Sequence, residues 1–375
     1  MLIIIFIITL SYVLLIGSFV IGFDKVPVLQ LKDAVVTTKF SIVIPFRNEA
    51  ENLPQLLKSI AQLEYPMPLF EILFVDDEST DNSVAIISDF VRQFKFVNIS
   101  VVKNKRITNS PKKDAITKAI DLAKYDWIVT TDADCELPVY WLDVFDHAIR
   151  TTDAKMLVAP VTFNLANSFF ERFQLLDILS LQGATIGGFG VGKPFLCNGA
   201  NLAYTKDIFR SLNGFDGNTD IASGDDIFML EKAVKRDQSA VLYVKHDQAI
   251  VTTTSQPNFK ALKSQRVRWA AKTTHYKNAF GKLTGFLVLL MNSLLVCLPL
   301  LWLLQVISLK TLAYAFAVKC LIDFLLLFKS ARFFGQERYL SSYFFSSLFY
   351  PFFNVYIAFT SLFKGYRWKD RAFMK

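Results

Sequence analysis

The chain has 375 residues, enough for two or three structural units, and its composition excludes a disordered protein. Hydrophobic residues make up 53% of it and the mean hydropathy is +0.34, whereas charged residues reach only 20%, so we expect part of the chain to lie in lipid. The net charge of +8 favours anionic lipids or phosphorylated ligands, but no run of Lys and Arg resembles a nucleic-acid-binding arm, so no nucleic acid partner is expected. The four cysteines show no CxxC spacing, which argues against a disulfide framework and a zinc site.

The N-terminus carries an uncharged stretch that predicts a membrane-spanning helix. Residues 2–23 contain no charged side chain, and at about 1.5 Å per residue a helix of this length crosses the roughly 30 Å hydrocarbon core. A cleaved signal peptide is the alternative, but no basic segment precedes the stretch, and it is longer than the apolar core of a signal peptide. We therefore assign residues 1–23 to an N-terminal transmembrane helix.

The next part of the chain alternates between strand-like and helix-like segments. Apolar runs rich in β-branched residues predict strands at 40–45, 70–75, 98–102 and 126–131. The segments that follow them predict helices at 52–63, 81–94, 112–123 and 138–150, the last with Pro138 in its first turn. Near-continuous apolar strands joined by helical crossovers are typical of an α/β domain whose parallel sheet is covered on both faces. Ligands of such sheets bind beyond the carboxyl ends of the strands.

Carboxylates gather where the second and the fourth predicted strands end. The second is followed by Asp76-Asp77-Glu78 and the fourth by Asp132-Ala133-Asp134, so both groups are expected at one edge of the sheet. Alternate carboxylates can hold Mg²⁺ or Mn²⁺ while phosphate oxygens of a nucleotide fill the other coordination positions. A solvated loop with helix-capping Asp is the alternative, and two clusters on one sheet weaken it. No GxxxxGK[ST] or GxGxxG motif follows a strand, which argues against a P-loop and a dinucleotide-binding fingerprint.

The C-terminal third contains further apolar segments, at 283–309, 312–328 and 340–363, which we expect to form two or three spans. No Asp or Glu occurs between residues 249 and 321, whereas residues 255–282 are rich in Lys and Arg. Basic residues beside a span favour the cytoplasmic leaflet. We therefore expect a basic interfacial helix at 255–282 and a cytoplasmic location for the domain before it.

Counting the spans leaves one segment in question. If every apolar segment crossed the membrane, the basic tail 364–375 would lie outside, against the positive-inside rule. We expect 340–363 not to cross, because Pro351 and Asn354 interrupt it near its middle. Lys319 and Asp323 are spaced to pair on one helix face, and both a structural ion pair and a functional pair remain open for them.

Four motifs in a fixed order carry a resemblance to a known family. They are Pro45-Phe-Arg-Asn-Glu49, the Val75-Asp-Asp pair, Asp132-Ala-Asp134, and Gly224-Asp-Asp226 followed by Gln265-Arg-Val-Arg-Trp269. Over residues 40–269 the chain resembles a membrane-bound family 2 glycosyltransferase, similar to ceramide glucosyltransferase-like and polysaccharide synthase-like enzymes. The resemblance implies an α/β domain of the GT-A fold at 24–254, with a mostly parallel mixed sheet, helices on both faces and flanking transmembrane helices, the C-terminal ones at 283–363.

The resemblance also implies roles in binding a nucleotide sugar. The residues matched to the base, the ribose and the nearby basic position are Glu49, Asp76, Asp77 and Lys112. Carboxylates suit the first roles because they accept hydrogen bonds from ribose hydroxyls or a base N–H, and an ammonium is a point charge for phosphate. Asp132 and Asp134 match the sugar-nucleotide and metal motif, with Asp134 as the stronger candidate for the direct metal ligand. The metal neutralises the leaving diphosphate.

Asp226 matches the catalytic base of the family, and Asp225 is expected to orient it. A carboxylate suits this role because the acceptor hydroxyl attacks the anomeric carbon in line, inverts its configuration and loses its proton late. An N-cap for a helix over residues 227–235 is the alternative for Asp226. Gly199 and Asn201 lie where the family has its acceptor-side strand and turn, and a plain glycine turn is an equally good interpretation.

The last motif has the QxxRW pattern, formed by Gln265, Arg268 and Trp269. Gln265 and Trp269 are spaced to share one helix face, and in the family this helix closes over the diphosphate and the acceptor. Arg can bind phosphate bidentately and Trp can stack on an acceptor sugar or headgroup. A basic interfacial helix without a catalytic part is the alternative. One departure from the family pattern is Glu78, which stands where Gly commonly follows the Asp pair.

The resemblance implies an inverting hexosyltransferase that uses a nucleotide-diphosphate sugar such as a UDP-sugar, Mg²⁺ or Mn²⁺, and a membrane lipid or glycolipid acceptor. We expect a multi-pass protein of the cytoplasmic membrane. The alternatives are a processive polysaccharide synthase that couples polymerisation to export, and a non-enzymatic membrane scaffold derived from a transferase.

Overall fold

The computed structural model describes the chain except for residues 32–33, 95–97, 222, 364–365, 369–370 and 374–375. The described residues form two compact units. The helical unit consists of Met1–Val26, Leu165–Leu196 and Ser255–Lys375, and the sheet unit consists of Pro27–Asn164 and Cys197–Thr254. The basic tail expected at 364–375 falls partly outside the described residues, and its described parts form an antiparallel pair, β11 (Tyr366–Trp368) and β12 (Arg371–Phe373).

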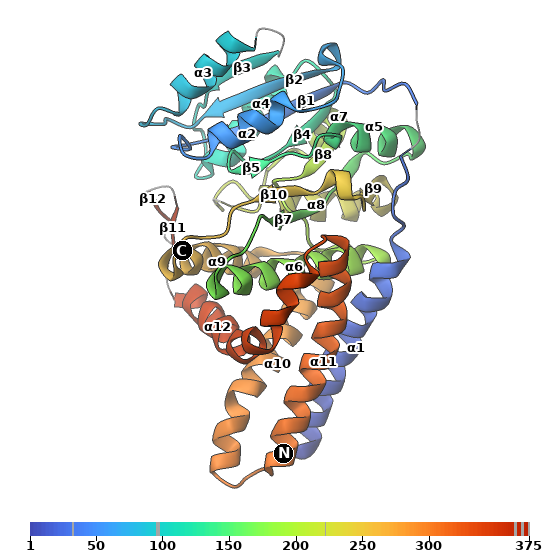
Figure 1. Ribbon diagram of the computed structural model, residues 1–375, viewed down its shortest axis with the longest axis vertical. Coiled ribbons are helices and arrows are strands. Elements are labelled where there is room, and N and C mark those ends of the chain that lie inside the picture. Colours follow the sequence, from blue (N-terminus) through green and yellow to red (C-terminus); the bar gives the residue numbers. More distant parts are fainter. Residues whose placement is uncertain (32–33, 95–97, 222, 364–365, 369–370, 374–375) are drawn as a thin grey trace. The chain divides into compact units, whose positions relative to one another are not determined.

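The sheet unit is built on a seven-stranded sheet that is mostly parallel (Figure 1). Its strands, in spatial order, are β3 (Ile99–Lys103), β2 (Phe70–Asp76), β1 (Phe40–Phe46), β4 (Trp127–Thr130), β8 (Leu202–Thr205), β6 (Met156–Val158) and β9 (Val241–Tyr243). Strand β8 runs antiparallel to β4 and β6, and the other pairs are parallel. A smaller sheet joins β5 (Cys135–Glu136), β10 (Val251–Thr253) and β7 (Val161–Phe163). The predicted α/β class with a mostly parallel mixed sheet is confirmed.

The helices that follow the first strands begin and end close to the predicted residues, with one exception. They are α2 (Leu53–Ala61), α3 (Ser83–Gln93), α4 (Pro111–Leu122) and α5 (Trp141–Thr151). The prediction that Pro138 lies in the first turn of α5 is wrong, because the helix begins three residues later at Trp141. Residues 135–136 are held extended as β5 against β10, so the chain turns into the helix only after this pairing ends.

The register of the parallel strands brings the loops after β1, β2 and β4 to one edge of the sheet. Phe46 lies opposite Asp76, and Val43 lies opposite Thr130. Six of the seven residues of β1 are buried, which is expected for a central strand with both faces covered. The loops that carry the predicted carboxylates therefore leave the sheet side by side.

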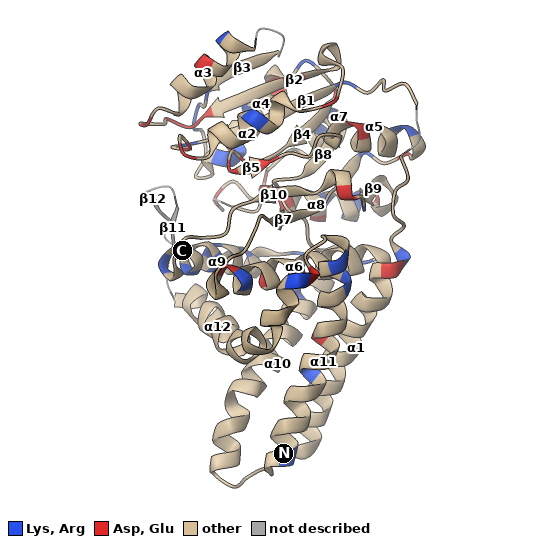
Figure 2. Ribbon diagram, viewed as in Figure 1, with Lys and Arg blue, Asp and Glu red and all other residues tan. Residues whose placement is uncertain are grey.

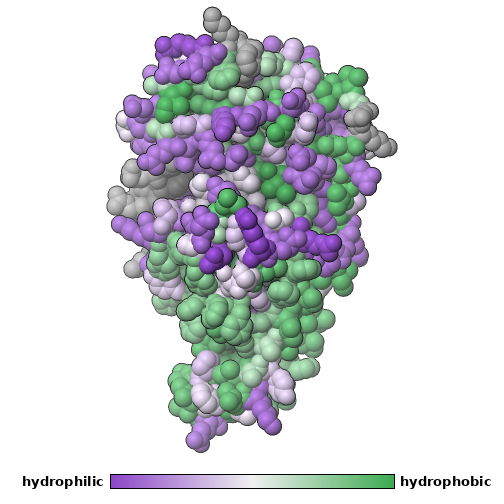
Figure 3. All heavy atoms as spheres, viewed as in Figure 1, coloured by the Kyte–Doolittle hydropathy of each residue, from purple (hydrophilic) through white to green (hydrophobic). Residues whose placement is uncertain are grey.

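The helical unit contains six long helices. They are α1 (Leu2–Lys25), α6 (Phe169–Gly190), α9 (Phe259–Ala271), α10 (Ala279–Leu303), α11 (Leu309–Phe333) and α12 (Tyr343–Phe363). Among the described residues, α1, α10 and α11 are long and apolar enough to cross a membrane. Figure 2 shows these helices with little charge along most of their length, and Figure 3 shows an apolar surface over this part of the unit. The three predicted spans at 2–23, 283–309 and 312–328 correspond to these helices.

Helix α12, which corresponds to the predicted segment 340–363, runs in a different direction from α10 and α11, the two other predicted C-terminal segments. It lies across the direction of α10 and α11 in Figure 1 and is not among the helices that meet the length and hydropathy of a span in the described chain. That 340–363 does not cross the membrane stays a prediction. The predicted interruption is wrong, because α12 is continuous through Pro351, although a proline inside a helix removes one backbone hydrogen bond.

Helices α1 and α6 approach each other closely where both carry glycine. A Cβ on Gly187 would lie 2.6 Å from the backbone of Phe19, and one on Gly190 would overlap the backbone of Gly22. Only residues without a side chain allow two helix backbones to come this close. The N-terminal helix therefore depends on these glycines for its place against α6.

We expect Gly187→Ala to destabilise the helical unit, because its Cβ would push on the Phe19 backbone, which cannot rotate away. Overpacking of this kind costs about 1–3 kcal/mol. The measurement is the apparent midpoint of thermal unfolding in detergent. The matched control is Gly285→Ala in α10, where the added Cβ would meet open space. There the midpoint should stay or rise, since Ala favours a helix over Gly by about 0.5–1 kcal/mol. Equal effects of the two variants would contradict the close approach.

Candidate active site

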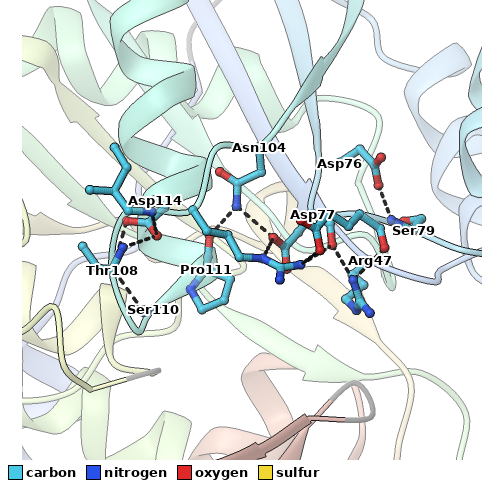
Figure 4. A network of polar contacts seen from close by, with 12 residues as sticks. Arg47, Asp76, Asp77, Ser79, Asn104, Thr108, Ser110, Pro111 and Asp114 are labelled. Carbon is cyan, nitrogen blue, oxygen red and sulfur yellow. Dashed lines mark hydrogen bonds and ion pairs between the residues drawn. The ribbon is translucent and has the colours of Figure 1, made fainter.

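Polar contacts join the loops that follow β1 and β2 (Figure 4). The guanidinium of Arg47 donates to the carbonyl oxygens of Asp77, at 2.7 Å, and of Glu78, at 2.6 Å. The backbone N–H of Asn48 donates to Ser79 Oγ at 3.1 Å. The two loops are thus held together at the edge of the sheet, and Arg47, the middle of the Pro45–Glu49 motif, has a structural role that the sequence did not reveal.

Glu49 and Asp76, two of the predicted nucleotide-binding residues, lie at this edge and are more than nine-tenths buried. The carboxylate of Glu49 accepts from Asn52 Nδ2 at 2.7 Å, and its backbone N–H donates to Ser83 Oγ at 2.8 Å. Asp76 Oδ1 accepts from the backbone N–H of Ser79 at 2.9 Å. These bonds fix both carboxylates within the loops of the sheet.

Glu78 has a left-handed backbone with φ of +60°. This conformation favours glycine, which explains physically why Gly is common at this position in the family that the sequence resembles. The Glu78 carboxylate pairs with the guanidinium of Arg106. The departure from the family pattern therefore introduces backbone strain together with one ion pair.

Asp77 is connected to the start of α4 by a side chain that the sequence analysis did not single out. Asn104 donates to Asp77 Oδ1 at 2.9 Å and to the carbonyl oxygen of Pro111 at 3.0 Å. Arg106 Nε donates to the same Asp77 oxygen at 2.8 Å. Figure 4 shows this chain of contacts running from Arg47 through Asp77 to Pro111. Asn104 and Arg106 lie just after β3, at the same edge of the sheet. Their position directly after a predicted strand is the feature of the sequence that could have indicated them.

Two neighbours on α4 hold the surrounding loops. Asp114 accepts from the backbone N–H groups of Ile107 and Thr108, both at 2.9 Å, and so folds the loop that carries Arg106. Lys113, only 1% exposed, donates to the carbonyl oxygens of Asn218 at 2.6 Å and Ile221 at 2.8 Å. It thereby holds the loop before α8 (Asp225–Arg236).

Lys112 joins two of the predicted carboxylates, Asp132 and Asp225. Its ammonium lies 2.7 Å from Asp132 Oδ1 and 3.3 Å from Asp225 Oδ2, so it links the end of β4 to the start of α8. Burial by itself lowers the pKa of Lys112, but the charges of Asp132 and Asp225, the hydrogen bond to Asp132 and the charge of Asp226 outweigh it and hold the pKa above its usual value. Lys112 therefore remains protonated throughout the physiological range.

Asp226 lies in the first turn of α8, beside this cluster. The helix begins at Asp225 after Gly224, which has φ of +85° and occupies the N-cap position, so the alternative that Asp226 is the N-cap is wrong. Asp226 Oδ2 accepts from the backbone N–H of Gly199 at 3.2 Å. A Cβ on Gly199 would lie 3.0 Å from Asp225 Oδ2 and 3.5 Å from Lys112 Nζ, so the side chains of the cluster lie closely around this turn.

Asn201, the other residue predicted near the acceptor, is fully buried. Its amide donates to the carbonyl oxygens of Pro160 and Ala249, both at 2.7 Å, and its oxygen accepts from Trp141 Nε1 at 2.9 Å. The side chain joins three segments of the core. In this structure Asn201 contributes to the fold of the sheet unit, whereas Gly199 lies beside the carboxylates.

Asp134 lies in a small pocket whose other lining residues are Asn52, Gln55, Cys135, Glu136, Asn164, Thr252, Thr253 and Thr254. Burial, followed by the charges of Asp134 and Asp132, raises the pKa of the Cys135 thiol well above its usual value, so this thiol is no nucleophile. Across the part of the chain that the structure describes, no three His, Cys, Asp or Glu side chains form a cluster that could hold a metal by themselves. The two carboxylates of the Asp132–Asp134 motif are hard oxygen donors, and Mg²⁺ is commonly bound by one or two carboxylates with substrate phosphates completing the set. The donor set fits that mode.

Gln265, Arg268 and Trp269 lie on α9 in the helical unit. They form one continuous stretch of helix, so Gln265 and Trp269 share a face as expected. The guanidinium of Arg266, between them in sequence, lies 4.2 Å from the centroid of the Trp269 ring and hydrogen-bonds to Gln265 Oε1. The QxxRW residues are thus connected to each other by a residue that the motif leaves unspecified.

Two family comparisons agree with this arrangement. Residues 41–211 match the family described as Glycosyl transferase family 2, and residues 127–358 match the one described as Glycosyl transferase family group 2. Among solved structures, the mannosyltransferase PcManGT from Pyrobaculum calidifontis, in complex with GDP-Man and Mn²⁺, is similar with a TM-score of 0.54 at 17% identity, over 92% of this chain and 97% of that one. This likeness shows a shared GT-A fold.

Two curated relatives differ in their products. The beta-monoglucosyldiacylglycerol synthase of Nostoc sp. is 25% identical over 238 residues, which cover 61% of this chain and 48% of the relative. The poly-beta-1,6-N-acetyl-D-glucosamine synthase of Staphylococcus epidermidis is 24% identical over 240 residues, which cover 61% and 53%. The chain spans about half the length of the curated relatives that it matches.

We expect Lys112→Met to destabilise the sheet unit by about 2 kcal/mol near neutral pH, the range for hydrogen bonds to charged groups. Without the ammonium, the negative charges that it holds together repel one another in the folded protein, and acid weakens a repulsion between carboxylates, so the loss should be smaller at pH 5 than at pH 8. The measurement is the thermal unfolding midpoint of both proteins across this range. Lys118→Met, a half-exposed lysine of the same helix, is the control. A pH-independent loss would contradict the role of Lys112 as the counter-ion.

Proposed function

The chain belongs to the family 2 glycosyltransferases, and we propose that it transfers a sugar, with inversion, from a nucleotide-diphosphate sugar to a hydroxyl group of a membrane lipid or glycolipid. The observation that carries the proposal is the meeting of Asp132, Asp225 and Asp226 with Lys112 at the carboxyl edge of the parallel sheet. Ligands of open α/β sheets bind at this edge. A non-enzymatic scaffold has no need for partly buried carboxylates from separate segments around one ammonium.

The loops after β1 and β2 suit the nucleoside part of the donor. Glu49, Asp76 and Asp77 have their carboxylates fixed by neighbouring amides and backbone N–H groups, so they are preorganised to accept from ribose hydroxyls and a base N–H. Arg106, beside Asp77, adds a planar guanidinium on which a base can stack. A UDP-sugar is the donor that we propose.

The start of α4 suits the diphosphate. Pro111 and Lys112 are the first residues of this helix, and the N-terminus of a helix favours an anion. Asp132 and Asp225 hold the ammonium of Lys112 at this place. A small rotation of the lysine side chain would bring the ammonium to a phosphate oxygen. A diphosphate is therefore favoured both by the helix and by the charge at its first turn.

The divalent metal would be held by Asp134 and Asp132, with phosphate oxygens and water in the other positions. We propose Mg²⁺ or Mn²⁺, because both prefer carboxylate oxygens. When bound, the metal neutralises charge on the departing diphosphate.

Asp226 has the base role in this proposal. As the acceptor oxygen forms its bond to the anomeric carbon, the bond from that carbon to the diphosphate oxygen breaks, and the hydroxyl proton passes to the Asp226 carboxylate. The N–H of Gly199 orients this carboxylate, and Asp225 is kept from competing because Lys112 neutralises it. The attack from the opposite face inverts the anomeric configuration.

The helical unit supports a lipid acceptor and a cytoplasmic catalytic domain. With α1, α10 and α11 as the spans, residues 26–278 and 334–375 fall on the same side of the membrane. Both stretches carry basic residues close to the spans, which is the pattern of cytoplasmic segments. The similarity to a monoglucosyldiacylglycerol synthase also favours a lipid acceptor.

A processive polysaccharide synthase is the second candidate, because the chain is equally similar to a poly-beta-1,6-N-acetyl-D-glucosamine synthase. The two functions differ in the length of their products. Incubation of the purified full chain with lipid extract and excess radiolabelled nucleotide sugar, followed by sizing of the products, separates them. Single-sugar lipids support the first function and a ladder of long glycans supports the second.

We expect Asp226→Asn to lower kcat at least about 100-fold while nucleotide affinity stays within about twofold, because the amide cannot take the proton but leaves the donor site intact. The measurement is transfer from a labelled nucleotide sugar together with calorimetric titration of UDP. Asp207→Asn is the matched control, since Asp207 is also an acidic residue in the first turn of a helix, α7 (Lys206–Ser211). Normal turnover of the Asp226 variant would remove this residue from the base role.

We expect Asp134→Ala to weaken UDP binding in the presence of Mn²⁺ by at least about tenfold, and to leave the weak binding in EDTA unchanged. The reason is that only the metal-dependent part of the affinity passes through this carboxylate. Glu136→Ala is the control, because Glu136 lines the same pocket and accepts from Gln55 at 2.6 Å. Equal losses in the two variants would assign the effect to the pocket as a whole. If the parent protein bound no nucleotide in either condition, the scaffold interpretation would replace the enzyme.

A further inference from the structure

We infer that Arg266 and Asp177 are positioning residues for the QxxRW face of α9: a buried guanidinium sets the orientation of Gln265 and Trp269, and a carboxylate on α6 fixes that guanidinium. Arg266 occupies a position that the QxxRW pattern leaves open, and Asp177 belongs to a helix outside every motif in the sequence. The consequence for sugar transfer rests on the proposed function, whereas the positioning itself is a property of the helical unit.

The ion pair between the two residues is buried. Arg266 is 6% exposed and Asp177 is 7% exposed, and Arg266 Nε lies 2.7 Å from Asp177 Oδ2. A charge removed from water to this extent needs its partner, because an unpaired buried charge is strongly unfavourable. The guanidinium therefore has one well-defined place relative to α6.

The same guanidinium contacts two of the three QxxRW side chains. It hydrogen-bonds to Gln265 Oε1, and its carbon lies 4.2 Å from the centroid of the Trp269 ring. Its Nη2 atom is buried and has no hydrogen-bond partner among the described residues, so the carboxylate and the stacked ring are what compensate its burial. A displacement of the Arg266 guanidinium would therefore also displace the ring of Trp269.

Asp177 is in turn connected to the membrane helices. Tyr350 of α12 lies close enough to Asp177 for the charge of this carboxylate to act on its hydroxyl, and the ammonium of Lys319 lies 5.3 Å from the Tyr350 ring centroid. Lys319 pairs with Asp323 at 2.9 Å, and Asp323 accepts from the Tyr12 hydroxyl at 2.7 Å. Among the charged residues of this series, the positive Arg266 and Lys319 alternate with the negative Asp177 and Asp323. The Lys319–Asp323 pair, left open by the sequence, thus belongs to a set of contacts that joins α1, α11, α12 and α6 to the QxxRW helix.

The planar fork of arginine is needed for this arrangement. Nε of the guanidinium donates a hydrogen bond to Asp177 and Nη1 donates one to Gln265. The flat face of the group lies on the ring of Trp269. A lysine in its place keeps the charge but cannot present a flat face and several donors at fixed angles. A residue at this position therefore determines how rigidly the Trp269 ring is held.

The test uses the full chain in lipid nanodiscs, labelled with 5-fluorotryptophan and observed by ¹⁹F NMR. The Trp269 signal is assigned by its loss in Trp269→Phe. Arg266→Gln and Asp177→Asn should each shift or broaden this signal, and the double variant should add little to either single one, because both remove the same contact. Lys260→Gln, which removes an exposed charge from the same helix, should leave the signal unchanged.

The kinetic readout of the same variants separates positioning from chemistry. Arg266→Gln and Asp177→Asn should lower kcat for lipid glycosylation roughly ten- to hundredfold, the effect of a displaced contact group, while the Kd for UDP stays unchanged. Arg266→Lys and Asp177→Glu keep the charges and should fall between parent and neutral variants, and they report the effect even if a neutral variant fails to fold.

Two outcomes would overturn the inference. One is a Trp269 signal that is the same in the parent and in all folded Arg266 and Asp177 variants. The other is additive effects of the two neutral substitutions. Failure of the proposed function is distinguishable from both: the parent would then glycosylate no lipid, although its Trp269 signal still responded to loss of the ion pair.

Discussion

The ammonium of Lys112, held between Asp132 and Asp225, is the contact on which the arrangement of the candidate site depends. Its three participants come from the start of α4, the end of β4 and the start of α8, segments that are distant in the sequence. Carboxylates at this spacing repel one another, so they can be half-buried together only around a cation. The missing side chain of Gly199 gives the cluster its room. In the function that we propose, donor binding and proton removal would thus share one electrostatic centre.

The sequence predicted the features that depend on local pattern, and missed those that depend on contacts between distant segments. Strands β1 to β4 were predicted within one or two residues because each is a continuous apolar run, and the carboxylates were predicted at one edge because parallel strands end together. The strands of three residues, β6, β7, β9 and β10, are too short to show a period of two. The sequence did not reveal the partners of the predicted residues, among them Arg47, Asn104 and Arg106, because these contacts form only when the folded chain brings the loops together.

Contacts between distant segments also explain why the structure differs from some interpretations of the sequence. Asp226 was weighed as an N-cap because Asp is common there, but the left-handed Gly224 starts the helix one residue earlier and turns Asp226 towards Gly199. Asn201 is close to Gly199 in sequence, yet the chain turns at residues 199–200, and the asparagine side chain ends in the core against Trp141. The close contact of α1 with α6 rests on glycines whose spacing alone predicts nothing about their partner.

A buried ion pair contributes little to stability, because the loss of hydration offsets most of the attraction between the charges. Its contribution is geometric: a misplaced partner leaves a buried charge unpaired, so only one arrangement is tolerated. In each unit a paired cation lies beside the residues of a motif: Lys112, whose partner Asp132 is partly exposed, in the sheet unit, and the buried Arg266 in the helical unit. The two side chains differ in geometry and flexibility. Lys112 is a point charge on a flexible stem, whereas Arg266 is a planar group fixed on several sides. In the function that we propose, a site that binds and releases a diphosphate needs the first kind of cation, and a helix that presents one face needs the second.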